Sequence, residues 1–225
     1  MLKTRLYARV TYRKTGLLAF LGHLDVARAF DRAVRRAKLP VEYSQGFSPH
    51  ALISFASPLP VGVAGEAELC AIDLAAEWAP QAVLKALARQ LHPDLTVGTA
   101  QVLPRGKRSP FADLAAADYR VAYRGVTDAD LRGALERLLA RPEWPVHRAT
   151  KSRELDLDLR PRVGDLVLAP GGVVRMRLGL AEDNLAKPEE VLGLLAMELG
   201  PAAEAHDLTR TAIWMRGEVG RKFTD

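Results

Sequence analysis

Short segments of this chain change between the two-residue repeat of a strand and the 3.6-residue repeat of a helix, in an order that occurs twice. Residues 5–12 alternate apolar and polar side chains, whereas the apolar positions of residues 23–38 follow helical spacing. The other patterns of the first half predict strands at residues 51–55, 66–74 and 95–103 and a helix at residues 79–90. The order β-α-β-β-α-β is the split unit of ferredoxin-like domains.

The second half of the chain repeats this order. Patterns typical of strands occupy residues 119–123, 153–159, 171–180 and 205–214, and helical patterns occupy residues 128–140 and 188–199. Between the halves, residues 104–117 combine proline, glycine and charge, which is typical of a linker. We therefore predict an α+β protein of two tandem ferredoxin-like domains, residues 1–103 and 118–225, joined by that linker.

Composition narrows the class of protein. The chain is 48% hydrophobic and 26% charged, as expected for a globular protein with a buried core. No apolar run approaches the roughly 20 residues that cross a bilayer, and the N-terminal residues lack the apolar core of a signal peptide. The single cysteine, Cys70, excludes an internal disulfide and an all-cysteine metal site. These features predict a cytoplasmic protein without a membrane partner.

Charge is distributed unevenly between the halves. Residues 1–108 carry 15 Lys and Arg against 8 Asp and Glu, a net charge of +7, whereas residues 109–225 carry 17 against 19, a net charge of −2. A basic excess confined to one half favours a polyanionic partner for that half, most simply RNA. A general enrichment in arginine and alanine is the alternative explanation.

Arginines form a stripe on the first predicted helix. Arg28, Arg32 and Arg35 follow each other at intervals of four and three residues and so share one face, with Arg36 beside them. Like charges at this spacing repel each other unless an anion offsets them, and phosphates would do so. We predict that the stripe binds RNA phosphates, together with Arg13 and Lys14 from the preceding segment. A solvated helix face, partly neutralised by Asp31, is the alternative.

A polar loop, EYSQGFSPH, follows the arginine-rich helix at residues 42–50. Aromatic side chains on such a loop can stack on unpaired bases, and its hydroxyl and amide groups can reach base edges. We predict RNA contacts from Tyr43, Gln45, Phe47 and Ser48. The alternative is an ordinary connection whose aromatic side chains enter the core. We also expect the loop to double back toward the start of the helix.

Two histidines would meet if the loop doubled back. His23 opens the helix, where the dipole favours a neutral imidazole that can accept a proton, and His50 ends the loop. Together they could serve as the catalytic pair of a metal-independent ribonuclease. The alternative is that His23 only caps or packs the start of the helix. The five histidines show no metal-ligand spacing and the chain has no nucleotide-binding glycine loop, so we expect no metal and no cofactor.

Several of these motifs resemble the radical-SAM-linked family of uncharacterised bacterial proteins, a domain of unknown function. The matching pieces are the His-Leu-Asp run at residues 23–25, the arginine-rich helix, the YSQGF segment and its following proline, the run PLPVG at residues 58–62, and SRELDLDLRPRV at residues 152–163. Gly22 departs from the serine expected as the helix N-cap. The resemblance covers nearly the whole chain.

The resemblance implies association with a radical SAM protein, as a fused domain or a separately encoded neighbour, in a genomic setting close to RNA processing. It implies no known reaction, and the chain lacks the three-cysteine motif that holds a radical SAM cluster. We therefore expect an RNA-binding accessory protein without catalytic residues of its own. Two alternatives remain: an endoribonuclease resembling the repeat-associated RNA endonucleases, and a protein-only adaptor for the radical SAM partner.

Overall fold

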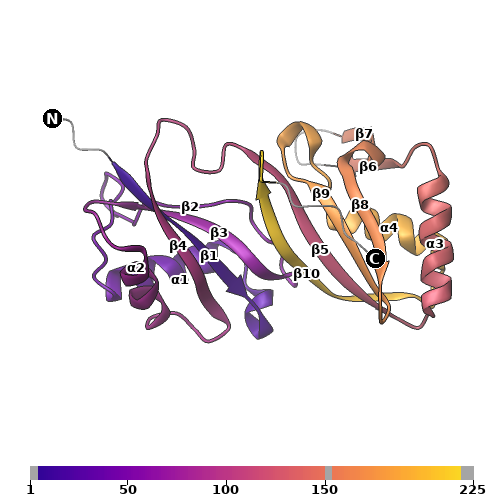
Figure 1. Ribbon diagram of the computed structural model, residues 1–225, viewed down its shortest axis with the longest axis horizontal. Coiled ribbons are helices and arrows are strands. Elements are labelled where there is room, and N and C mark those ends of the chain that lie inside the picture. The colour runs from indigo at the N-terminus through magenta and orange to yellow at the C-terminus, as the bar shows by residue number, and fades with distance from the viewer. Residues whose placement is uncertain (1–4, 150–153, 219–225) are drawn as a thin grey trace. The chain divides into compact units, whose positions relative to one another are not determined.

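The chain divides into two compact units, Met1–Asp113 and Leu114–Asp225, in a computed structural model that describes residues 5–149 and 154–218. Among the described residues, each unit combines an antiparallel sheet with two α-helices, so the predicted α+β class is confirmed (Figure 1). No helix in the described part of the chain is long and apolar enough to cross a membrane.

The first unit has the predicted order of elements. Its elements are β1 (Leu6–Lys14), the short 3-10 helix η1 (Gly16–Phe20), α1 (His23–Arg36), β2 (Ile53–Phe55), β3 (Ala64–Leu74), α2 (Pro80–Ala88) and β4 (Leu95–Pro104). The strands lie in the order β4-β1-β3-β2, and every neighbouring pair is antiparallel. Val10 at the centre of β1 lies opposite Cys70 on β3 and Ala100 on β4.

One face of this sheet forms the core of the first unit. Ala8, Val10 and Tyr12 alternate along β1 and pack against both helices, because successive side chains of a strand point to opposite faces. Phe30 of α1 is completely buried there, and its ring lies edge-on to Tyr12 with the ring centroids 5.1 Å apart. The opposite face of α1 is therefore left to solvent.

The second unit contains more elements than the sequence predicts. They are β5 (Leu114–Arg124), α3 (Asp128–Ala140), β6 (Pro145–Ala149), β7 (Glu154–Asp158), η2 (Arg160–Arg162), β8 (Val163–Ala169), β9 (Val173–Gly179), η3 (Glu182–Asn184), α4 (Pro188–Leu199) and β10 (Glu204–Met215). The strands β10-β5-β9-β8 form the sheet of this unit, again with antiparallel pairs, and β6 and β7 form a separate two-stranded sheet.

Three features of this part of the chain differ from what the sequence predicts. The strand expected at residues 153–159 is β7, which pairs with β6 instead of joining the main sheet; Arg153 lies outside the described residues. The strand beside β9 is β8, which the sequence did not reveal. Alternation of apolar and polar residues predicts a strand but does not say which strand it pairs with. Although β7 lies in the hairpin, its Leu157 still packs against the core of the second unit. In addition, β5 begins at Leu114, inside the segment expected to be a linker.

Candidate nucleic-acid interface

The outer face of α1 presents arginines to solvent. The helix buries Val26, Phe30 and Val34 against the sheet, and the four predicted arginines lie on the opposite side and are exposed: Arg28, Arg32, Arg35 and Arg36. Gly22 caps the helix without a side-chain hydrogen bond, as its lack of a hydroxyl requires. The predicted stripe is therefore accessible along the whole length of the helix.

Neighbouring groups offset most of the repulsion within this stripe. Arg28 pairs with Asp25 at 3.2 Å, and Nε of Arg35 donates to Asp31 Oδ2 at 2.8 Å. Arg36 donates through Nη2 to the carbonyl oxygen of Gln90 at 2.6 Å. The helix therefore does not need a bound anion to be stable, and repulsion within the stripe does not by itself indicate a phosphate ligand.

Arg32 is the member of the stripe with the freest charge. It is exposed, and it makes no hydrogen bond or ion pair with any residue in the described part of the chain. Its neighbours on the helix also remain cationic, although Asp25 compensates the charge of Arg28 and the neutral Gln90 carbonyl leaves that of Arg36 uncompensated. Exposed ion pairs contribute about 0–1 kcal/mol, so a phosphate can replace such a partner at little cost.

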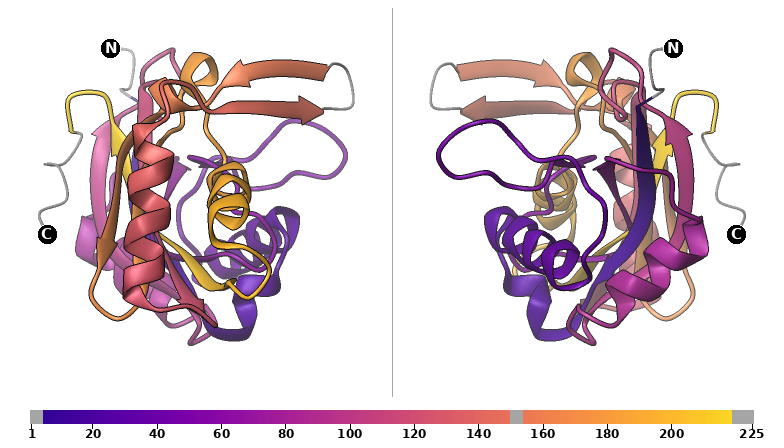
Figure 2. Two further views of the ribbon diagram at one scale, coloured as in Figure 1. Left: turned by 90° about the vertical axis from the view of Figure 1, so that its right-hand side faces the viewer. Right: turned by 90° about the vertical axis from the view of Figure 1, so that its left-hand side faces the viewer.

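The loop that follows α1 is closed at its base and open at its tip. Ser44 and His50 form the base through three hydrogen bonds: Ser44 N–H to the His50 carbonyl oxygen at 2.9 Å, His50 N–H to Ser44 Oγ at 3.1 Å, and Ser44 Oγ with His50 Nδ1 at 2.9 Å. Residues 45–49 form the tip and are all exposed. Figure 2 shows the connection between α1 and β2 as a long loop that leaves the body of the unit.

Two contacts tie this loop to α1. Arg35 donates through Nη2 to the carbonyl oxygen of Pro49 at 2.5 Å, and the Ala51 N–H donates to Asp31 Oδ1 at 2.9 Å. The Arg35 guanidinium also lies over the ring of Tyr43, 5.0 Å from its centroid. Burial raises the pKa of the Asp31 carboxyl, but the hydrogen bonds from Arg35 and Ala51 outweigh it, so this pKa lies below its ordinary value. Asp31 thus stays ionised and holds both partners.

The two aromatic side chains of the loop have different surroundings. Tyr43 is partly buried, bridges to Ala51 and packs on the core of the first unit. Phe47, beside Gly46 at the tip, is completely exposed. Gly46 has a φ of +129°, a conformation that other residues adopt with strain, so it permits the turn that presents Phe47. Gln45 and Ser48 are exposed on either side.

Two of the predicted phosphate contacts lie away from this surface. Lys14 is 2% exposed, and its Nζ donates to the carbonyl oxygens of Ala19 and Leu21 at 3.0 and 3.2 Å, so the expectation that it meets RNA is corrected. Arg13 is exposed but precedes Lys14 in β1, so it points to the sheet face opposite the helices. The predicted cluster therefore reduces to the arginines of α1.

The two histidines do not meet, so the prediction that the loop doubles back is wrong. His23 lies edge-on to Phe55, with ring centroids 5.2 Å apart, whereas His50 is held by Ser44 near Asp31. Asp31 comes eight residues after His23, which is about 12 Å along a helix at 1.5 Å per residue. Residues 50–55 run back along α1 and bring Phe55, not His50, to its start. In the part of the chain that the structure describes, the predicted pair of His23 and His50 is therefore not formed.

Sequence reasoning missed Asp31 as an anchor of the loop. Its spacing from Arg35 predicts an ion pair on the helix, which the structure contains, but its bond to Ala51 joins residues that the sequence does not relate. The second marker segment of the resemblance, residues 152–163, also contributes Asp158 and Arg160 to the lining of a pocket in the second unit.

Comparisons with known proteins place the chain in a family but suggest no activity. No curated protein matches it. A solved structure titled "Crystal Structure of a Cbf5-Nop10-Gar1 Complex" contains a chain with 11% sequence identity and a TM-score of 0.47. The match covers 92% of this chain and 48% of that one, so this chain spans about half the length of the chain it matches. Residues 7–188 match the family described as "Uncharacterized protein conserved in bacteria (DUF2344)", and the chain belongs to this family.

Proposed function

We propose that this protein is an RNA-binding accessory protein that presents RNA to a radical SAM enzyme, or docks that enzyme, in RNA modification or processing. One observation carries the RNA-binding part of the proposal: Phe47 stands fully exposed at the tip of a loop that two contacts hold against an arginine-bearing helix. An exposed aromatic side chain loses free energy in water unless a partner covers it.

The chemistry of this surface favours single-stranded RNA. Arginine side chains of α1 bind phosphates, and an exposed phenyl ring stacks on a base that is not already stacked in a duplex. Gln45 and Ser48 flank Phe47 and offer hydrogen-bond donors and acceptors to base edges. The loop carries no charge at its tip, because the neighbouring helix supplies it.

We also infer that each unit is a ferredoxin-like domain. The strand orders β4-β1-β3-β2 and β10-β5-β9-β8 support this, because each places the first strand of the unit between the third and the fourth, as in a β-α-β-β-α-β fold. In the second unit the β6–β7 hairpin is then an insertion after the first helix. The boundary between Asp113 and Leu114 fits a two-domain chain whose connection is shorter than residues 104–117.

Fluorescence anisotropy with a labelled single-stranded RNA tests the RNA-binding part of the proposal. Replacing Arg28 and Arg32 by Ala should weaken binding and lower the slope of log K against log salt by about 1.4, since each phosphate contact with a single strand contributes about 0.7. Arg132→Ala is the matched control, because Arg132 is an exposed arginine of a helix in the other unit. Absence of binding at low salt, or an unchanged slope in the double variant, would contradict the proposal.

The resemblance described above supports the radical SAM partner, and a pull-down from the source cell tests it. Retention of an iron–sulfur protein after ribonuclease treatment would indicate direct docking, whereas its loss would indicate contact through RNA. If the iron–sulfur protein binds while RNA does not, the protein-only adaptor replaces the proposed function. No enrichment of an iron–sulfur protein in either sample would count against the partnership.

A further inference from the structure

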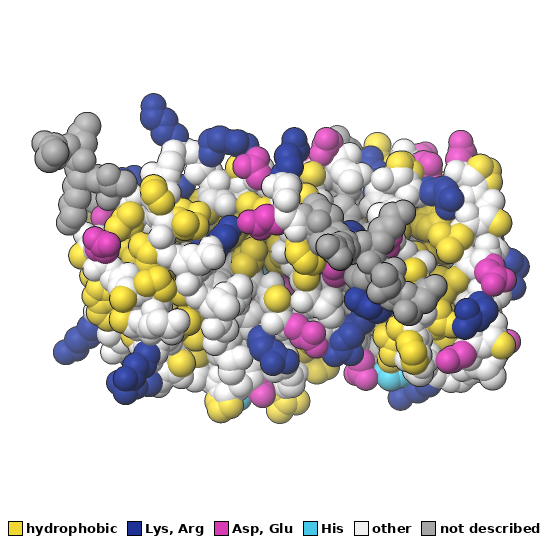
Figure 3. Space-filling model, viewed as in Figure 1, with side chains coloured by type: hydrophobic (Ala, Val, Ile, Leu, Met, Phe, Trp, Pro, Cys, Tyr) yellow, Lys and Arg dark blue, Asp and Glu magenta, His cyan; other side chains and the backbone are white. Residues whose placement is uncertain are grey.

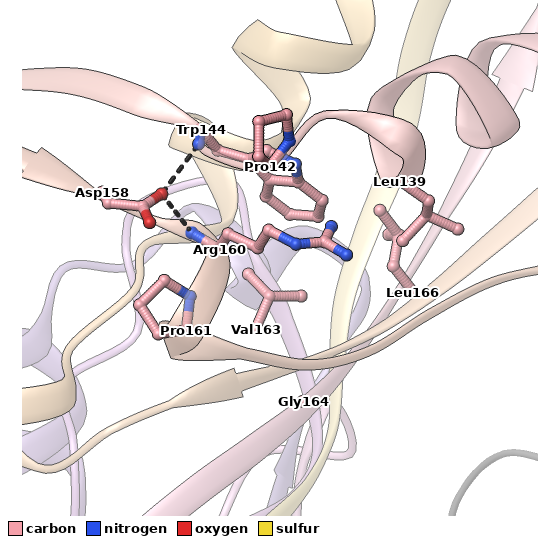
Figure 4. A pocket seen from close by; sticks show the side chains of 9 residues that line it. All are labelled: Leu139, Pro142, Trp144, Asp158, Arg160, Pro161, Val163, Gly164 and Leu166. Carbon is pink, nitrogen blue, oxygen red and sulfur yellow. Dashed lines mark hydrogen bonds between the residues drawn. The ribbon is translucent and has the colours of Figure 1, made fainter.

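A pocket in the second unit lies between the end of α3, η2 and the start of β8. Its volume is about 480 Å³, and it is lined by the residues labelled in Figure 4: Leu139, Pro142, Trp144, Asp158, Arg160, Pro161, Val163, Gly164 and Leu166. Hydrophobic side chains are visible on the surface between α3 and β8 in Figure 3. Pockets of about 300–1,000 Å³ with apolar walls and a few polar groups commonly bind small ligands.

Arg160, which stacks on Trp144, and the carboxylate of Asp158 form the polar side of this pocket. The guanidinium carbon of Arg160 lies 5.4 Å from the centroid of the Trp144 ring, within the range of a cation–π contact. Trp144 itself is 1% exposed, and its Nε1 donates to the Leu138 carbonyl oxygen at 2.9 Å. Figure 4 shows the guanidinium next to the ring, pointing toward Leu139 and Leu166.

Asp158 fixes this arrangement through the backbone. Its Oδ1 accepts hydrogen bonds from the Trp144 N–H at 2.7 Å and from the Arg160 N–H at 3.0 Å. The carboxylate therefore holds together the two residues whose side chains stack. Asp158 is a positioning residue, since its bonded oxygen is already occupied by two donors.

The guanidinium of Arg160 has no acceptor among the residues that the structure describes. Its neighbours differ: Arg162 donates to the carbonyl oxygens of Asp183 and Leu185, and Arg148 forms a two-bond pair with Glu190. An arginine that stacks on a ring keeps its in-plane N–H groups available, and these form a fork that fits phosphate or carboxylate. The pocket therefore offers an unused anion-binding fork.

The carbonyl group of α3 that Trp144 contacts is occupied by two donors. Helix C-termini carry a partial negative charge from unpaired carbonyl groups. The Leu138 carbonyl oxygen accepts from both the Trp144 indole and the Arg141 N–H, the latter at 3.1 Å, so this carbonyl is already satisfied. The remaining walls come from Leu139, Pro142 and Val163 and suit a flat apolar group.

We propose that this pocket binds a nucleoside monophosphate, with the phosphate on the Arg160 fork and the base against the exposed side of the guanidinium and the apolar walls. Flat heterocycles stack on guanidinium planes as well as on aromatic rings. The site is independent of the α1 surface, so it goes beyond the proposed function. Two sources share this chemistry, a free nucleotide and the phosphorylated end of an RNA strand.

Isothermal titration calorimetry on the full chain tests the site, with the four ribonucleoside 5′-monophosphates, the four nucleosides and inorganic phosphate as probes. At least one monophosphate should bind more tightly than its nucleoside and than phosphate. Arg160→Gln should weaken that binding by about tenfold or more, because it removes a charge-assisted hydrogen-bonded pair. Arg162→Gln is the matched control, since Arg162 lies two residues away and binds backbone carbonyls outside the pocket. Arg160→Lys keeps the charge without the fork and should bind with intermediate affinity.

Short RNA strands with and without a 5′-phosphate distinguish the two sources. A preference for the phosphorylated strand that Arg160→Gln abolishes and Arg28→Ala leaves intact assigns the pocket to an RNA end. Binding of free monophosphates without such a preference assigns it to a free nucleotide. Equal binding by wild type and a folded Arg160→Gln variant would overturn the proposal, as would binding of nothing but inorganic phosphate. Thermal unfolding curves that match wild type establish that the variant is folded.

Discussion

The guanidinium of Arg35 donates a hydrogen bond to the carbonyl oxygen of Pro49, across a distance of 2.5 Å. The same guanidinium binds Asp31 and lies over Tyr43, so one side chain joins α1 to both ends of the loop that carries Phe47. Tyr43 packs on the core at the start of this loop, and Phe47 lies exposed at its tip. Residues of α1 therefore determine the position of the loop. Substituting these helix residues should weaken binding at the loop even where they do not contact the RNA themselves.

Asp31→Ala should weaken RNA binding even though it removes a negative charge from a surface that binds an anion. Coulomb attraction alone predicts tighter binding. The variant also loses the acceptor of the Ala51 N–H and of Arg35 Nε, so the loop becomes mobile and must be ordered again upon binding. RNA affinity and hydrogen exchange of the loop amides measure both effects.

Asp25→Ala is the control for this comparison. It removes a negative charge from the same helix, but Asp25 pairs with Arg28 and has no hydrogen bond or ion pair to the loop among the described residues. Its RNA affinity should stay the same or rise. An equal rise in both variants would show that the anchoring of the loop is irrelevant to binding.

Phe47→Ala should weaken binding of single-stranded RNA and leave the stability of the protein unchanged. The loss should correspond to about 1–3 kcal/mol, the usual contribution of one base stacked on an aromatic side chain. Stability should not change because the ring is completely exposed and buries no area in the folded protein. Anisotropy and urea unfolding measure the two quantities.

Met197→Ala serves as the matched control, since Met197 is a large exposed hydrophobic residue in the second unit, 77% accessible. If Phe47→Ala binds RNA as wild type does, Phe47 has no part in stacking. A general loss of affinity in both variants would point to nonspecific hydrophobic contact instead.

Asp118→Ala should destabilise the second unit by about 1–3 kcal/mol, because it removes one acceptor of a buried ion pair while Asp165 stays 3.6 Å from the Arg177 guanidinium. Asp118 of β5 lies directly opposite Arg177 of β9 and accepts two hydrogen bonds from its guanidinium, at 2.6 and 2.8 Å. Both side chains are buried, with 7% and 8% of their surface exposed. The free energy of unfolding in urea measures the effect.

Asp113→Ala is the corresponding change in an exposed pair. Arg108 and Asp113 are 3.1 Å apart, and at least half of each side chain is accessible. Water and salt screen such a pair, so the change should cost less than about 1 kcal/mol. Similar losses in the two variants would mean that the Asp118 pair is solvated in solution.

The pair of Glu190 and Arg148 should make stability depend on pH in the acidic range. Burial raises the pKa of the Glu190 carboxyl, but hydrogen bonds from Arg148 and from the Lys187 N–H outweigh it, and the pKa lies below its ordinary value of 4.5. A carboxyl whose pKa falls on folding stabilises the protein above its unfolded pKa, and this contribution is lost as pH falls through the folded value.

Glu190→Gln should therefore be less stable than wild type at neutral pH, and the difference should shrink below pH 4.5. Urea unfolding at a series of pH values measures it. Glu189→Gln, a change at the exposed neighbour of Glu190, should leave the pH dependence unaltered. A difference between Glu190→Gln and wild type that is independent of pH would contradict the assigned ionisation.

Local signals in the sequence determined the helices and most strands of this protein. α3 covers Asp128–Ala140, as predicted, because Thr127 and Asp130 form a capping box within one turn. α4 covers Pro188–Leu199, as predicted, and begins with proline at a position where its missing N–H has no cost. The exposure of the arginines of α1 was also predictable from a local signal, because helical spacing places them on a different face of the helix from Phe30.

The tertiary structure decided which strand pairs with which and which side chains are available. The sequence of β7 alternates whereas that of β8 does not, and only the contacts of Leu157 and of β9 assign β7 to a hairpin and β8 to the sheet. Lys14 and Arg13 are neighbours in a basic segment, but Lys14 is buried and its amino group binds the carbonyl oxygens of Ala19 and Leu21. Asp31 and Ala51 are twenty residues apart, and their bond fixes the loop. Such contacts form only when long stretches of chain close into loops. A local sequence pattern does not specify which distant residues this closure brings together.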